Sequence, residues 1–131
     1  MRRQSREIAL QILFQTEFTP KLSRSEFVAV HEQEFDRETL DYAEDLIDGV
    51  IEHKADIDSK IQAASRHWKI ERMAGVDRNM LRIAVFEMKF AANPIKENII
   101  IDEAIEIAKK FGTTDSGAFV NGVLDQIAKG S

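Results

Sequence analysis

Four carboxylates between positions 41 and 52 are the strongest candidates for chemistry in this sequence. Their spacing of three or four residues places them along one face of a helix. Two carboxylates on such a face could share a divalent cation and support a hydrolase, or the row could receive a basic protein partner. The third interpretation is a solvated surface. This acidic ridge consists of Asp41, Asp45, Asp48 and Glu52.

No other set of residues has the spacing of a catalytic or metal site. His31, His53 and His67 lie on separate segments, without the His-x-x-x-His spacing of a zinc site. The chain has no cysteine, which excludes disulfides, thiolate ligands and cysteine nucleophiles. The sequence also lacks a glycine-rich phosphate loop and a Gly-x-Ser-x-Gly elbow. We therefore expect no enzymatic activity, no metal and no cofactor.

Arginines at positions 2, 3 and 6 open the chain and could line the first turn of a helix. The helix dipole opposes cations at a helix N-terminus, so Arg2, Arg3 and Arg6 suggest a use beyond helix formation. The guanidinium fork matches phosphate oxygens, which favours phosphate contact; the alternative is a frayed, solvated terminus. The net charge of −5 argues against a general polyanion binder. A basic end and an acidic middle could serve two different partners.

Two charged residues interrupt the most apolar part of the chain. Arg82 and Glu87 lie among residues 80–91, where most side chains are apolar. A buried arginine needs carboxylate or carbonyl partners. Because they are five positions apart, these two residues do not pair along one helix. We expect each of them to anchor a neighbouring helix or cap, and we also expect a structural role for Glu103.

Apolar residues recur at steps of three and four, which predicts an all-helical protein. We find no strand-type alternation, no internal repeat and no low-complexity linker. The segment from residue 80 to residue 91 is apolar on nearly every side, so its helix is expected at the centre. The expected helices cover residues 5–18 and 25–33, a segment capped by Asp36 with its stripe over 40–51, a segment around 57–61 that could continue it, a segment from after Gly75 to 91, residues 101–111, and a last stripe over 119–128.

Two glycines near the C-terminus carry specific expectations. Gly112 follows the sixth helix, at a position where a left-handed residue commonly ends a helix. Asn121-Gly122 normally indicates a turn, but the apolar stripe continues through it. We therefore expect a helix there, with Gly122 allowing the close approach of a neighbour.

Together these features predict a single seven-helix domain over residues 1–131. No apolar run approaches the roughly 18 residues that a membrane span needs. The basic start of the chain lacks the apolar core and cleavage site of a signal peptide. We expect a cytoplasmic protein.

Four segments, in order along the chain, resemble the motifs of one known protein family. The opening, R-R-x-x-R-E-x-A-L-x-x-L-F at 2–14, resembles the start of that family. Residues 76–87, with the pattern V-D-R-x-x-L-R-I-A-x-F-E, resemble the central helix of that family. The next two motifs are I-D-E-A-I-E-I-A-K-K-F-G at 101–112 and D-S-x-x-F-V-N-G-V-L-D at 115–125. The family is that of the transcription antitermination factor NusB, and the resemblance covers nearly the whole chain.

The resemblance implies an all-helical, non-enzymatic protein built from two packed helical bundles. It implies binding of single-stranded boxA RNA in ribosomal RNA leaders, together with the ribosomal protein NusE, and loading of an antitermination complex onto RNA polymerase. Some similar proteins pair into homodimers that hide the RNA surface. The NusE-facing residues carried over are Phe14 and Asp77, the latter expected to be exposed. The RNA-binding residues carried over are Arg2, Arg3, Arg6, Asp115, Ser116 and Phe119.

The sequence also departs from the family pattern at several positions. Gln4 stands where the family often has a third arginine in its opening run. Phe14 and Phe86 stand where tyrosine is common, and Ala118 where a basic residue is common. Each change removes a polar contact, so we expect modest RNA affinity for the isolated chain. Two other functions stay open: an adaptor that binds a basic protein without RNA, and the N-terminal domain of a ribosomal RNA cytosine methyltransferase.

Overall fold

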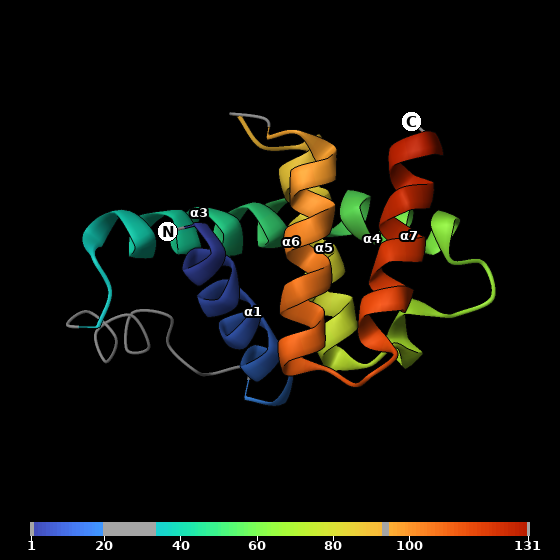
Figure 1. Cartoon of the computed structure of the whole chain (residues 1–131), viewed down its shortest axis with the longest axis horizontal. Coiled ribbons are helices and arrows are strands. Elements are labelled where there is room, and N and C mark those ends of the chain that lie inside the picture. The colour runs from blue at the N-terminus through green and yellow to red at the C-terminus, as the bar shows by residue number, and fades with distance from the viewer. Residues whose placement is uncertain (1, 20–33, 93–94, 131) are drawn as a thin grey trace.

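The computed structural model describes residues 2–19, 34–92 and 95–130 of the chain. These residues form six α-helices and one short 3-10 helix, and no strand lies among them (Figure 1). The all-helical prediction is therefore confirmed, although the predicted helix over 25–33 lies outside the described residues. The elements are α1 (Arg2–Phe18), α3 (Arg37–Glu52), α4 (Lys54–Ala64), η1 (Ile70–Arg72), α5 (Gly75–Lys89), α6 (Glu97–Phe111) and α7 (Ser116–Gly130).

Helix α5 is the centre of the fold, as its apolar sequence predicts. It contacts each of the other five α-helices in the described part of the chain. Met80, Leu81 and Ile83 are fully buried, and they belong to one apolar cluster that reaches every α-helix shown in Figure 1. The helix ends at Lys89, slightly before the predicted boundary near residue 91.

Helices α3 and α4 follow one another along the long axis of the molecule, behind α6 (Figure 1). Asp36 caps α3 as predicted, because its carboxylate accepts a hydrogen bond from the Thr39 amide at 2.8 Å. The two helices are separate rather than continuous, with a break at His53, where φ is −105° and ψ is 17°. The imidazole of His53 stacks on Phe90, with ring centroids 4.7 Å apart.

The stripe predicted for α3 needs one correction. Its other members are buried, but the side chain of Ile51 is 62% exposed. Ile51 follows Val50 directly, and successive residues on a helix point about 100° apart, so Val50 and Ile51 do not face the core together. No helix within the described ranges is long and apolar enough to cross a membrane.

The two C-terminal glycines differ from their predicted roles. Gly112 has φ −102° and ψ −149°, which is not left-handed. A Cβ at Gly112 would overlap the Ser116 hydroxyl and lie 2.8 Å from the Ala108 carbonyl oxygen, so glycine is needed there for close packing. Gly122 lies within α7, as predicted, but a Cβ there would meet nothing within 4 Å. The predicted close approach occurs instead at Gly49, where a Cβ would overlap the Phe86 ring.

Candidate functional site

The first turn of α1 lies against α6 through Arg3. The Arg3 Nε donates to Glu103 Oε1 at 2.9 Å, and its Nη2 bonds the second oxygen of the same carboxylate. This hydrogen bond, with the charge of Arg3, lowers the pKa of Glu103. The Arg3 side chain remains 41% exposed. Arg3 is therefore oriented by Glu103 yet accessible to a ligand.

Arg6 has a different environment from the other two arginines. Its Nε lies 2.6 Å from Glu87 Oε1 and its Nη2 lies 2.9 Å from Glu87 Oε2, while Nη1 reaches Glu103 at 3.2 Å. The Arg6 side chain is 3% exposed. The expected phosphate contact at Arg6 does not agree with this position, because two carboxylates and the core enclose its guanidinium.

The Arg6–Glu87 pair is stabilised as a charged pair. Burial lowers the pKa of Arg6, but the hydrogen bond and charge of Glu87 outweigh it and hold the pKa above its ordinary value. Tyr42 donates its hydroxyl to Glu87 Oε2 at 2.6 Å. Burial, together with this bond, raises the pKa of Tyr42 to about 12. Glu87 therefore joins α5 to α1 and α3, which confirms its predicted anchoring role.

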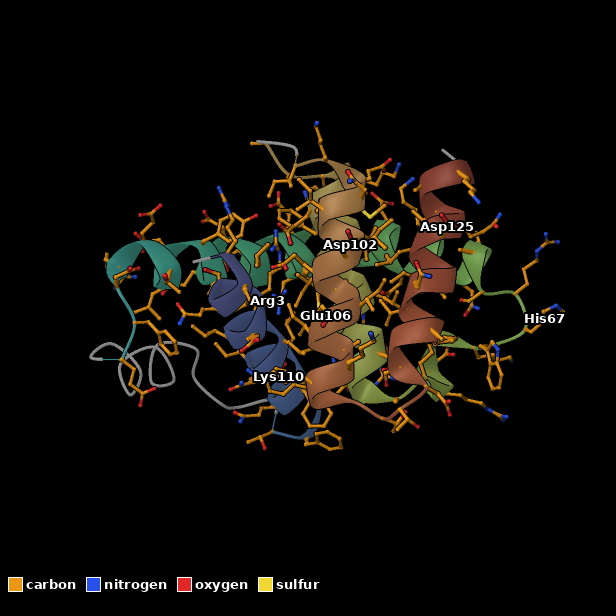
Figure 2. The ribbon with its side chains drawn as sticks, in the orientation of Figure 1. Arg3, His67, Asp102, Glu106, Lys110 and Asp125 are labelled. Atoms are coloured by element: carbon orange, nitrogen blue, oxygen red, sulfur yellow. The ribbon has the colours of Figure 1, made fainter. Side chains whose placement is uncertain are left out.

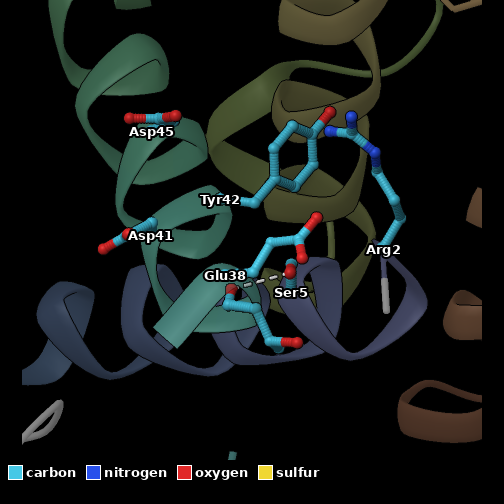
Figure 3. A pocket seen from close by; sticks show the side chains of 7 residues that line it. Arg2, Ser5, Glu38, Asp41, Tyr42 and Asp45 are labelled. Carbon is cyan, nitrogen blue, oxygen red and sulfur yellow. Dashed lines mark hydrogen bonds between the residues drawn. The ribbon is translucent and has the colours of Figure 1, made fainter. Parts of the chain in front are cut away.

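Arg2 lies outside the core and over an aromatic ring. Its guanidinium carbon is 3.8 Å from the centroid of the Tyr42 ring, within the range of a cation–π contact (Figure 3). Both residues border a hollow of about 220 Å³ between α1 and α3, beside the Ser5 hydroxyl, which donates to the Thr39 carbonyl at 2.7 Å. Tyr42 was not predicted as a site residue, and it supports both Arg2 and Glu87.

The acidic ridge borders the same hollow from the α3 side. Asp41 and Asp45 line it with Glu38, and the side chain of Asp41 accepts from Arg37 Nε at 2.8 Å. Across the ranges that the structure describes, no group of three or more His, Asp or Glu residues is arranged to hold a metal ion. The shared-cation interpretation of the ridge therefore lacks a ligand set there.

The residues expected at the start of α7 divide between surface and interior. Ser116 is buried and its hydroxyl accepts from the Thr113 amide at 2.9 Å, so it shapes the turn before α7. Phe119 is partly buried against the core. Asp115 is exposed. Of these three side chains, Asp115 is the most accessible to a ligand.

A lysine that sequence reasoning missed lies between the arginines and α7. Lys110 is in the last turn of α6, and its Nζ lies 3.0 Å from Glu7 Oε1 on α1. Figure 2 shows Arg3 on α1, with Glu106 on the adjacent α6 and Lys110 further along α6 towards its end. From Glu103 to the end of α6 is about 12 Å of helix. Lys110 therefore adds an exposed cation at the end of α6, held by Glu7 of α1.

Phe14 and the first turn of α5 form the second candidate surface. A Cβ at Gly75 would overlap the Phe14 ring, so the two segments are in close contact. Asp77 is 9% exposed, which corrects the expectation of an exposed carboxylate. Its Oδ1 is buried and has no hydrogen-bond partner among the described residues. Phe18, one turn beyond Phe14, is largely exposed, with the two rings 5.1 Å apart. We call Phe14, Phe18 and Asp77 the partner face.

A second ion-pair network, which sequence reasoning did not predict in full, supports the partner face. Arg82 Nε donates to Asp58 Oδ1 at 2.8 Å and Nη1 reaches Glu17 at 3.3 Å, which confirms the predicted anchoring of neighbouring helices. Arg78 Nη2 donates to Glu17 at 2.5 Å. Burial raises the pKa of Glu17, but the hydrogen bonds from Arg78 and Asn79 outweigh it, so the pKa lies below its ordinary value. These partners lie far apart in sequence, so helical spacing carries no signal for them.

Comparison with known proteins gives a consistent result over nearly the whole chain. A family model described as the NusB family matches residues 3–129. The chain is 64% identical over 128 residues to the transcription antitermination protein NusB of Bdellovibrio bacteriovorus, covering 98% of this chain and 95% of that relative. It is 46% identical over 136 residues to the protein of the same name from Anaeromyxobacter dehalogenans, covering 98% of this chain and 91% of that relative.

Solved structures are similar as well. The structure of T. maritima NusB has a TM-score of 0.88 at 38% identity, covering 98% of this chain and 91% of that one. A crystal structure of antitermination factors NusB and NusE in complex with dsRNA has a TM-score of 0.84 at 29% identity, covering 99% and 97% of the two chains. Both likenesses span all of the helices described above.

Proposed function

This chain belongs to the NusB family of transcription antitermination proteins, and we propose that it binds boxA-type ribosomal RNA leaders together with NusE. In this role it helps to load an antitermination complex onto RNA polymerase. The family is non-enzymatic. The observation that carries the proposal is the end-to-end similarity to a NusB that was crystallised with NusE and dsRNA. In this proposal the protein acts in the cytoplasm and without a cofactor. Residues 1–131 act as one domain, whose two helical bundles meet along α5.

The RNA surface runs from the start of α1 to the start of α7. Arg2 and Arg3 contact phosphates, because both guanidinium groups reach the surface. Asp115 and the ring edge of Phe119 contact bases at the other end, while Ser116 holds the turn between them. Arg6 acts indirectly, since its pair with Glu87 fixes the position of α1. With two phosphate contacts instead of three, the logarithm of the binding constant for single-stranded RNA should fall with the logarithm of the salt concentration with a slope of about −1.4.

Glu103 competes with RNA for Arg3. The carboxylate already occupies the fork that a phosphate would use. RNA binding therefore exchanges one charged partner of Arg3 for another, and the net gain is small. This exchange is a physical reason for modest RNA affinity in the isolated chain, in addition to its net charge of −5. Self-association over the same surface would lower the affinity further.

NusE binds the partner face. Exposed Phe18 and partly buried Phe14 supply apolar area, and Asp77 supplies an acceptor. Among the described residues no donor reaches this buried oxygen, and a buried carboxylate oxygen is costly to leave unsatisfied, so a docked protein that brings a donor to it is stabilised. A cationic donor would form the stronger, charge-assisted bond.

Size-exclusion chromatography of the chain with NusE and a boxA-type oligonucleotide tests this function. We expect the three components to elute together, whereas RNA with the chain alone elutes mostly free. A scrambled oligonucleotide is the control for sequence preference. If NusE elutes with the chain but never retains RNA, the chain is a protein adaptor and the proposed RNA role is wrong.

A further inference from the structure

The turn between α4 and η1 exposes an indole ring surrounded by positive charge. Trp68 is 62% exposed, and its neighbours from 66 to 69 are exposed as well. The stretch from 65 to 72 contains three cations, Arg66, Lys69 and Arg72, against one acid, Glu71. This local charge is opposite to the net charge of −5 of the chain. We call residues 65–69 the tryptophan loop.

The tryptophan loop is held in place by the end of α4. The Gln62 side chain donates to the Trp68 carbonyl at 2.8 Å and accepts from the Ile70 amide at 3.0 Å. The Trp68 amide donates to the Ser65 carbonyl at 3.0 Å, and the Ser65 hydroxyl donates back to Ile61 at 2.6 Å. The backbone that carries the indole is thus held in place, so little backbone entropy is lost when a ligand binds.

The cations of this region differ from those at the start of α1. Arg3 and Arg6 are both bonded to carboxylates of the chain. Within the described ranges, no carboxylate lies in ion-pair contact with Arg66, Lys69 or Arg72. A phosphate that binds Arg66 or Lys69 therefore displaces no internal partner. Unpaired cations beside an exposed aromatic ring are the combination that holds single-stranded nucleic acid, through phosphate contacts and base stacking.

We propose that the tryptophan loop is a second single-stranded RNA contact, with a base stacked on Trp68 and phosphates held by Arg66 and Lys69. His67, within this loop, lies at one end of the long axis, beyond α7, whereas Arg3 lies on the other side of α6, nearer the middle of the molecule (Figure 2). The loop therefore binds a different stretch of RNA from the arginine cluster formed by Arg2 and Arg3. It extends the contact beyond the proposed boxA surface and does not depend on that surface being correct.

Trp68 is the sole tryptophan of the chain, so its fluorescence reports this site directly. We would titrate the full chain at low salt with oligouridylate of about 16 nucleotides, and with an abasic sugar-phosphate chain of equal length. Saturable quenching by the oligouridylate, without quenching by the abasic chain, is the expected result. Trp68→Ala should weaken binding, followed by anisotropy of a labelled oligonucleotide, about tenfold.

Paired charge variants complete the test. Arg66→Ala with Lys69→Ala should flatten the salt slope by about 1.4. Lys54→Ala with Lys60→Ala removes the same charge from the exposed side of α4 and should leave quenching intact. Binding seen by anisotropy without quenching would place RNA elsewhere and overturn the loop site, while leaving the boxA proposal standing. Equal quenching by the abasic chain would show that the loop binds negative charge alone, as on an acidic surface, and would overturn base stacking on Trp68. An absence of binding by the full chain would also overturn the site.

Discussion

At the scale of single residues, the opening arginines have separate tasks that their shared chemistry does not reveal. Arg2 lies on Tyr42, Arg3 is exposed but bonded to Glu103, and Arg6 is enclosed with Glu87. The partners of Arg3 and Arg6 are 100 and 81 positions away in the chain. Local spacing identified the cluster but could not distinguish a surface arginine from a buried one, because that difference depends on where α5 and α6 pack.

Removing the competing carboxylate should strengthen RNA binding. Glu103→Gln keeps the shape of the side chain but weakens its hold on Arg3, so RNA affinity of the isolated chain should rise about two- to fivefold. Glu106→Gln is the matched control, because it removes the same charge one turn along α6 from a residue that pairs with Lys109. Filter binding at several salt concentrations measures both variants. Equal gains would indicate a general charge effect and not release of Arg3.

Arg6 should prove to be a stability residue. Arg6→Ala leaves Glu87 charged and buried without its main partner, which should cost about 3–5 kcal/mol of unfolding free energy. Arg3→Ala breaks a partly exposed pair and should cost about 1 kcal/mol or less. Urea unfolding followed by circular dichroism compares them, and the double variant Arg6→Met with Glu87→Leu should recover much of the loss. Similar small losses for Arg6 and Arg3 would contradict an internal role for Arg6.

At the scale of elements, the helices could be predicted from sequence much better than their ends and contacts. Apolar steps of three and four located all six described α-helices, and the Asp36 cap was confirmed. The errors arose where a neighbour decides the geometry. Gly112 is required by the Ser116 hydroxyl and not by a left-handed backbone, while Gly122 faces open space. Helical period shows which side of a helix is apolar, but not how closely another backbone approaches it.

The two glycines make a matched pair for stability measurements. Gly122→Ala should raise the free energy of unfolding by about 0.5–1 kcal/mol, because alanine favours helix and the added methyl meets nothing. Gly112→Ala should lower it, because the methyl would overlap Ser116 and crowd the Ala108 carbonyl. Thermal unfolding at one pH measures both changes. A stabilising Gly112→Ala would contradict the close packing of the turn between α6 and α7.

At the scale of the whole molecule, the proposed RNA surface and the partner face share helix α1, and α5 packs against that helix. Helix α1 carries Arg2 and Arg3 at its start and Phe14 near its end. Helix α5 supports both ends, because Glu87 holds Arg6 and Arg78 holds Glu17. A partner docked at the end of α1 would therefore extend the proposed RNA surface. An acidic chain with few free cations on α1 gains most from a basic partner, which adds phosphate contacts.

The most direct test of this account is calorimetry around the full cycle of chain, NusE and boxA-type RNA. We predict that saturating NusE tightens RNA binding about 5- to 150-fold, the range of a typical coupling free energy of about 1–3 kcal/mol. RNA must then tighten NusE binding by the same factor. The variant Asp77→Asn, which keeps the size of this buried side chain but removes its charge, should weaken NusE binding while thermal stability and RNA affinity without NusE stay largely unchanged. If wild-type RNA affinity is the same with and without NusE, the two surfaces are independent and joint loading by this chain is contradicted.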